Sequence, residues 1–189
     1  MPTTAPKALH FTESDDANAL IAKDPFALLI GYVLDQQVTV QKAFAGPLVL
    51  RDRLGGTLTA DAVADADLET IFREKPALHR YPGVMATRVH NLAVHIRDEY
   101  DGDAERVWKD AADTDQLKAN LEGLPGIGEM KVKSLSSVLA KHFGIKTAEP
   151  LMPWHPTLGD VDSADALAEY QALKRAHKQE WKKAQPKRG

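Results

Sequence analysis

The chain of 189 residues contains no cysteine. Disulfides, cysteine nucleophiles, and zinc or iron–sulfur sites held by thiolates are therefore excluded. Aromatic residues make up only 6%, and no apolar run reaches the ~18 residues that a membrane-spanning helix needs. Residues 1–10 lack the apolar core of a signal peptide, so we expect a cytoplasmic protein with no membrane partner.

Positive charge is also scarce over most of the chain, and the net charge is −3. The exception is the C-terminal end, where residues 174–188 hold seven Lys or Arg and one Glu, a net +6 that leaves −9 for the rest of the chain. This segregation has two interpretations. In the first, the basic tail, residues 174–189, contacts nucleic acid. In the second, the tail is a terminal helix with a solvated charged face.

Apolar residues recur at helical spacing along most of the chain, which predicts an all-α fold. No strand pattern or internal repeat is present. The segment 145–159 has three prolines and no periodicity, so it is expected to be a loop. The longer helices are expected over residues 15–23, 25–34, 38–54, 85–100, 115–121, 130–143 and 164–185, with short ones over 59–63, 67–73 and 104–109.

The most informative segment is Leu124-Pro125-Gly126-Ile127-Gly128, which precedes a helical run. Two glycines two residues apart predict a tight turn whose backbone can approach a ligand closely. The free N–H groups of such a turn, next to a helix N-terminus, are donors for an anion. We expect this anion to be a DNA phosphate, although a hairpin that only connects two packed helices is the alternative.

This segment resembles the helix-hairpin-helix of the HhH-GPD superfamily of base-excision DNA glycosylases, which includes endonuclease III, adenine glycosylase and alkyladenine glycosylase. Residues 34–38 (LDQQV) resemble the QQ element of that superfamily, and residues 80–92 (RYPGVMATRVHNL) resemble one of its helices. The resemblance covers residues 24–144. Within the superfamily the chain resembles a branch of actinobacterial type that lacks the iron–sulfur cluster.

The resemblance implies a two-lobed helical fold in a single domain, residues 1–189. The central lobe would span residues 24–122 and the helix-hairpin-helix residues 115–144. The second lobe would combine residues 14–23 with residues 145–185, followed by the basic tail.

The resemblance also implies a DNA-binding surface. In relatives, a residue of the QQ element enters the duplex or contacts the opposite base, and an amide can pair with base edges as donor and acceptor. Two solvated amides at a helix end are the alternative. The residues expected to bind DNA are Gly126, Ile127, Gly128, Lys131, Lys133, Gln36 and Gln37.

Asp35 is the first candidate for catalysis. It lies three residues after Tyr32, on the same face of the expected helix, and Tyr32 stands where some adenine-specific relatives carry a catalytic Glu. A carboxylate here would act as a general base or stabilise an oxocarbenium-like charge. A surface charge without catalytic role is the alternative, and Tyr32 is a candidate for the base pocket.

Two positions depart from the family. Met130 stands where bifunctional relatives carry a lysine nucleophile, and the neighbouring Lys131 is turned by about 100° around the helix, away from that cleft. A Schiff-base lyase mechanism is therefore disfavoured. Pro153 falls at the position of the family Asp, for which Glu149 is the first possible substitute, with Asp160 and Asp162 as others.

Trp154 and His155 follow Pro153. They are either base-pocket residues or a packing aromatic and its neighbour in a loop. The histidines of the chain show no metal-ligand spacing, so neither a metal site nor a cofactor is expected.

Together these features predict a monomeric, nucleoid-associated protein that binds double-stranded DNA and acts as a monofunctional N-glycosylase. One alternative is a non-catalytic protein that binds lesions or DNA structures with the same fold. Another is a helical protein-interaction module in which the hairpin is only structural.

Overall fold

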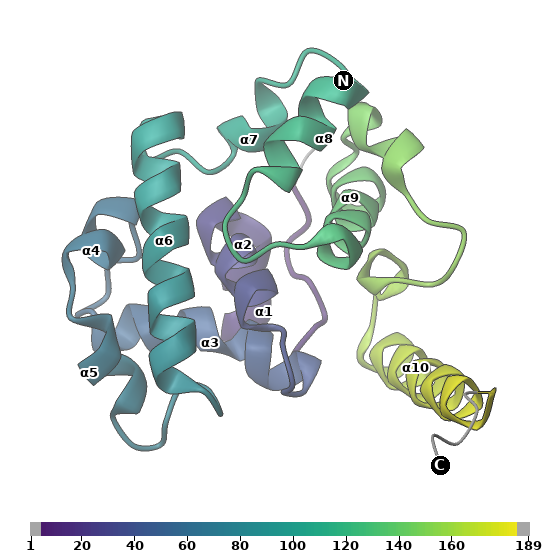
Figure 1. Ribbon diagram of the computed structural model, residues 1–189, viewed down its shortest axis with the longest axis horizontal. Coiled ribbons are helices and arrows are strands. Elements are labelled where there is room, and N and C mark those ends of the chain that lie inside the picture. Colours follow the sequence, from purple (N-terminus) through teal and green to yellow (C-terminus); the bar gives the residue numbers. More distant parts are fainter. Residues whose placement is uncertain (1–4, 185–189) are drawn as a thin grey trace.

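The computed structural model describes residues 5–184, and all regular secondary structure in this range is helical (Figure 1). The all-α prediction is confirmed. The α-helices are α1 (Asp15–Lys23), α2 (Pro25–Leu34), α3 (Val40–Arg53), α4 (Ala60–Asp65), α5 (Leu68–Arg73), α6 (Pro82–Tyr100), α7 (Arg106–Lys109), α8 (Thr114–Glu122), α9 (Glu129–Phe143) and α10 (Ala164–Ala184). Two 3-10 helices, η1 (Lys146–Leu151) and η2 (Leu158–Asp160), lie between α9 and α10.

Most of these helices begin at a side chain that accepts a hydrogen bond from an N–H group of the first turn. Such a cap stabilises a helix by about 1 kcal/mol. Among the described α-helices, α6, α9 and the four-residue α7 have no such side-chain cap. The caps are Ser14 (α1), Asp24 (α2), Thr39 (α3), Thr59 (α4), Asp67 (α5), Asp113 (α8) and Ser163 (α10).

Helix α2 forms the centre of the core, since every residue from Phe26 to Leu34 is buried. It packs unusually close to α3. A Cβ at Gly31 would lie 2.3 Å from the Phe44 ring, and a Cβ at Gly46 would lie 2.5 Å from Leu34 Cδ1. Glycines on both helices therefore permit the close approach that fixes the position of α2.

Helices α1, α3 and α6 pack directly on α2, which lies near the middle of the molecule in Figure 1. Helices α4 and α5 pack on α6 on one side, while η1 and η2 pack on α9 on the other. Helix α1 lies against α2 and α3. Helix α10 contacts η2 and is joined to α3 by reciprocal amide hydrogen bonds between Gln41 and Gln171 of 3.1 and 2.7 Å. The division into two lobes remains a prediction.

Several element bounds differ from the sequence-based prediction. Helix α3 begins at Val40 because Thr39 caps it, and α6 begins at Pro82, where proline suits the first turn. The segment expected to be an irregular loop contains η1 and η2. Thr157 and Asp160 form a capping box, which stabilises the start of η2. The end of the basic tail, residues 185–189, lies outside the described residues.

Within residues 5–184, no single helix is both long and apolar enough to cross a membrane. Only α1 and α2 taken together meet that length and composition, and they are bent by 114° at the break between them.

The contact between η2 and α9 depends on Gly159. A Cβ there would lie 2.6 Å from Ser137 Cβ and 2.7 Å from its carbonyl carbon, and backbone cannot move aside easily. We expect Gly159→Ala to lower the free energy of unfolding in urea by about 1–3 kcal/mol. The control is Gly128→Ser, at a site with nothing within 4 Å of a new Cβ. Equal stability of Gly159→Ala and wild type would contradict the close packing.

Candidate functional site

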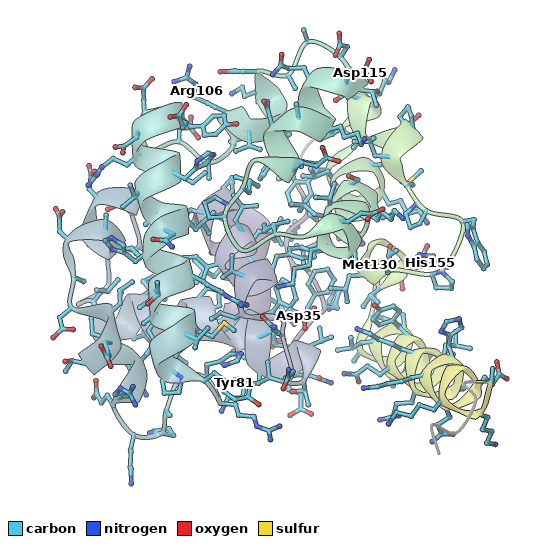
Figure 2. All side chains as sticks on the ribbon, in the orientation of Figure 1. Asp35, Tyr81, Arg106, Asp115, Met130 and His155 are labelled. Carbon is cyan, nitrogen blue, oxygen red and sulfur yellow. The ribbon has the colours of Figure 1, made fainter. Side chains whose placement is uncertain are left out.

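The candidate site is the short loop of residues 35–39 between α2 and α3, together with the side chains that reach this end of α2 from the start of α6 and from α9. Figure 2 shows Asp35 and Tyr81 near each other on one side of the molecule, whereas Arg106 and Asp115 lie at the opposite edge. The predicted QQ element and the predicted hairpin meet here, because Lys131 and Gly126 of the hairpin region both contact the end of α2.

Asp35 is the half-buried residue that ends α2. Its ψ of 67° ends the helix, while its N–H still donates to the Tyr32 carbonyl, so Asp35 is the C-cap of α2. Burial raises the pKa of its carboxyl group, and the positive charges of Lys174 and Lys131 partly oppose this rise. No side chain or backbone N–H within residues 5–184 donates a hydrogen bond to this carboxylate.

The side chain of Lys131 reaches the end of α2, two residues before Asp35. Its Nζ lies 3.4 Å from the Val33 carbonyl oxygen and 3.5 Å from that of Gly126. The long side chain bends back over the start of α9, which the angle of its Cα around the helix does not predict. Burial lowers the pKa of Lys131, while the charge of Asp35 raises it in part. The site therefore holds an amine and a carboxyl group whose pKa values are both perturbed, a pattern common at functional sites.

Gln36 and Gln37 are both held by side chains from the start of α6. The Arg88 guanidinium donates to Gln36 Oε1, and the Tyr81 hydroxyl donates to Gln37 Oε1 at 2.9 Å. Gln37 is exposed and has a φ of 54°, a conformation uncommon outside glycine. Each amide oxygen thus has a partner from the α6 side, and the interpretation of these residues as solvated amides at a helix end remains an alternative.

His79 anchors this arrangement to the core, and sequence reasoning gave it no role. Its ring is 1% exposed, with Nε2 2.9 Å from the Leu34 carbonyl oxygen, and its Nδ1 accepts the Tyr81 N–H at 2.9 Å. Since Nδ1 accepts and Nε2 must donate to a carbonyl, the ring is neutral. Burial is the main cause that lowers its pKa, which favours the same form.

The hairpin residues have different environments. Gly126 has a φ of 80°, and a Cβ there would lie 3.3 Å from both Val33 methyl groups, so it lets the turn pack on α2. The Ile127 side chain is buried, which confines any DNA contact by this residue to its backbone. Gly128 is exposed, has nothing within 4 Å of a new Cβ, and precedes the uncapped start of α9.

Met130 and Glu129 follow Gly128 on this surface. The neutral Met130 side chain is 64% exposed, and Glu129 is the residue that modifies the charge. Glu129 forms an ion pair with Lys133, with 3.4 Å between Oε1 and Nζ. The positive charge of Lys133 is thus partly compensated, whereas Arg88 has no acidic partner within 4 Å among the described residues.

The base-pocket candidates do not form one cluster. Tyr32 is 1% exposed, its hydroxyl lies 3.0 Å from Ser134 Oγ, and its ring packs edge-on against Phe44. It is thus a core residue. Trp154 is 96% exposed, which contradicts its interpretation as a packing aromatic.

Trp154 and His155 line a groove of about 350 Å³ between their loop and α10. Tyr170 forms part of the α10 wall of this groove. The negative charge of Asp35 contributes to raising the pKa of Tyr170, after the larger effect of burial. Asp35 itself is not one of the residues that line this groove.

The other candidate acids lie elsewhere. Glu149 is exposed in η1, which is held to the start of α8 by a 2.8 Å hydrogen bond from Thr114 Oγ1 to the Thr147 carbonyl. Helix η1 follows the C-terminal end of α9, which lies about 18 Å from Lys131 along the helix at a rise of 1.5 Å per residue. Asp160 accepts from the Thr157 N–H at 2.9 Å and pairs with Lys141. Asp162 is exposed.

We expect Asp35→Asn to raise the stability of the fold at neutral pH. Because the pKa of Asp35 is raised in the folded protein, ionisation favours the unfolded chain at pH values above the ordinary Asp value of about 3.9. Removing the charge abolishes that effect, so the gain over wild type should shrink as the pH falls toward about 4. Urea unfolding of both proteins at several pH values measures this gain in stability. A variant less stable than wild type at pH 7 would contradict a raised pKa of Asp35.

Within residues 5–184, no group of three or more His, Asp or Glu side chains is placed to hold a metal ion. Comparisons of the chain with protein-family models, with curated proteins and with solved structures found no match.

Proposed function

We propose that the protein binds double-stranded DNA through the 35–39 loop and the 126–131 hairpin, and removes a damaged or mispaired base as a monofunctional N-glycosylase with the HhH-GPD fold. The observation that carries the proposal is the open, uncapped start of α9 beside the half-buried carboxyl group of Asp35. The start of α9 would bind a DNA phosphate, and the Asp35 carboxylate would take part in the cleavage of the N-glycosidic bond.

The start of α9 suits a phosphate for three reasons. Its first-turn N–H groups have no side-chain cap, and a helix N-terminus carries about half a positive charge. Gly128 leaves the approach to them open. Lys131 and Arg88 add positive charge beside the 35–39 loop, although the rest of the chain is acidic.

Asp35 suits the chemical step because its carboxylate has an unoccupied hydrogen-bonding capacity. Base excision requires the target nucleotide to leave the helix, after which water attacks C1′ of the sugar and the base departs with the electrons of the N-glycosidic bond. Asp35 would accept the proton of that water or stabilise the positive charge on the sugar. The groove at Trp154, His155 and Tyr170 would receive the extruded base.

Lys131 does not change the assignment to monofunctional chemistry. A lyase needs a neutral amine that attacks the sugar. The charge of Asp35 and the carbonyl oxygens of Val33 and Gly126 favour the ammonium form of Lys131, whereas burial, the larger effect, lowers its pKa. The proposal of monofunctional chemistry therefore rests on Met130, which stands where bifunctional relatives carry the lysine nucleophile.

One observation favours a second function, a non-catalytic protein that binds lesions or DNA structures. The ammonium group of Lys131 lies where it compensates the charge of Asp35, and Met130 and Pro153 replace the two catalytic residues of the family. The two functions differ in whether a base is released. A protein-interaction module would show no salt-dependent DNA binding at all.

We expect Gly128→Asp to weaken duplex binding by at least about tenfold at low salt, because it places a carboxylate against the phosphate. The same change adds a favoured helix cap, so the thermal midpoint should stay the same or rise. Gly128→Asn is the matched control, with the same shape and cap but no charge. Affinities measured by fluorescence anisotropy at several salt concentrations test this, and wild-type affinity of both the Asp and the Asn variant would reject the hairpin as the phosphate site.

A further inference from the structure

We propose that α10 is an arm that lies along the phosphate backbone of the bound duplex, beyond the part held by the 35–39 loop and the hairpin. Four cations on one face of α10 make these contacts and form what we name the cationic stripe: Lys174, Arg175, Lys178 and Lys182. The proposal rests on the DNA binding proposed above and adds to it a second contact that is independent of base sequence.

The C-terminal half of α10 is not covered by the rest of the molecule. From Ala172 to Ala184, every residue whose side chain the structure describes is exposed. Figure 1 shows α10 at the edge of the molecule, apart from the other α-helices. This half is rich in Ala and Lys, which favour a helix without tertiary support. It is therefore available to a partner along its length.

The members of the stripe follow positions i, i+1, i+4 and i+8, which fall within about 100° around a helix. Lys174 and Lys182 are about 12 Å apart along the axis. A DNA strand carries one phosphate per about 3.4 Å of duplex axis, so the stripe spans about four of them. A membrane surface would need a continuous apolar face, but the face opposite the stripe carries His177 and Glu180 beside Leu173. The pattern therefore favours a duplex as the partner.

The rest of the chain does not account for these cations. No ion pair within residues 5–184 includes a member of the stripe. Lys174 lies instead over the Tyr170 ring, with Nζ 5.8 Å from its centroid. The helix dipole favours cations only in the last turn, whereas Lys174, Arg175 and Lys178 lie more than one turn before Ala184. The stripe thus keeps a positive charge that no neighbouring carboxylate compensates.

The stripe begins next to the candidate site. Gln171 is on the same face of α10, and its amide exchanges two hydrogen bonds with that of Gln41, two residues after the 35–39 loop. After burial, which raises the pKa of the Asp35 carboxyl group, the charge of Lys174 is the first influence that lowers it. A duplex held by the loop would therefore continue along the stripe.

A groove of about 630 Å³ lies where α10 meets the start of α3. Lys42 lines it from α3 and Arg175 from α10, so each of the two helices contributes a cation. Glu13, in the segment before α1, adds one carboxylate to the same groove. A phosphate backbone that passes from the 35–39 loop to the stripe would cross this groove between the two cations.

The test is the salt dependence of duplex binding by Lys178→Gln/Lys182→Gln, measured by fluorescence anisotropy on a labelled duplex without a lesion. Each phosphate contact contributes about 0.9 to the slope of log affinity against log salt concentration. We expect the slope of the variant to be smaller than that of wild type by about 1.8, with the two affinities converging toward about 1 M salt. The same loss should appear on duplexes of different sequence, because the backbone does not change.

Two controls separate the stripe from net charge. Lys109→Gln/Lys118→Gln removes the same charge from α7 and α8, on another side of the molecule, and should keep the wild-type slope (Figure 1). Lys178→Arg/Lys182→Arg keeps the charge and should also keep the slope. Lys and Gln have similar helix propensities, so α10 should stay helical, which circular dichroism checks. Lys178→Ala/Lys182→Ala provides a second neutral variant if the first loses the helix.

The outcomes separate the arm from the proposed function. A wild-type slope in both neutral variants would overturn the arm while DNA binding stands. An equal loss of slope in the control on α7 and α8 would also overturn it, because net charge alone would then explain the effect. Weaker binding of the neutral variants to vesicles of anionic lipid, with an unchanged slope on DNA, would assign the stripe to a membrane surface instead. If wild type shows no salt-dependent binding to the duplex, the proposed function itself fails.

Discussion

The carbonyl groups at the end of α2 need hydrogen-bond donors, and the side chains that supply them assemble the candidate site. A helix leaves its last four carbonyls without partners inside the helix. Lys131 from α9 approaches the Val33 carbonyl, and His79 from the segment before α6 meets that of Leu34. Because α2 is buried on all sides and fixed against α3 through Gly31 and Gly46, its end is a rigid point to which two distant parts of the chain attach.

This arrangement explains why the perturbed groups lie together. Asp35 follows directly after the buried helix, so its carboxyl group is desolvated and its pKa is raised. Lys131 is desolvated at the same place, and its pKa is lowered. Each charge partly opposes the effect of burial on the other. A carboxylate at the distant end of α9, such as Glu149, has no comparable surroundings.

Much of the fold could be predicted from the sequence because helices and their caps are local. Ser14 and Thr59 stand one residue before the helices they cap, and Gly144 takes the left-handed conformation expected of a helix end. The site was less predictable. His79 meets a partner 45 residues away and Arg88 one 52 residues away, contacts for which the sequence contains no local signal. The direction of Lys131, the burial of Tyr32 and the exposure of Trp154 likewise depend on tertiary packing.

Release of a base from DNA tests the proposed N-glycosylase activity most directly. Labelled duplexes carrying uracil, hypoxanthine, 8-oxoguanine, an alkylated purine or mismatched adenine would be incubated with the protein and then treated with alkali to cleave abasic sites. We expect product from one of these substrates, only after alkali, and none with Asp35→Asn. Absence of product from every substrate by a protein that binds DNA would contradict the catalytic role of Asp35 and leave a DNA-binding protein.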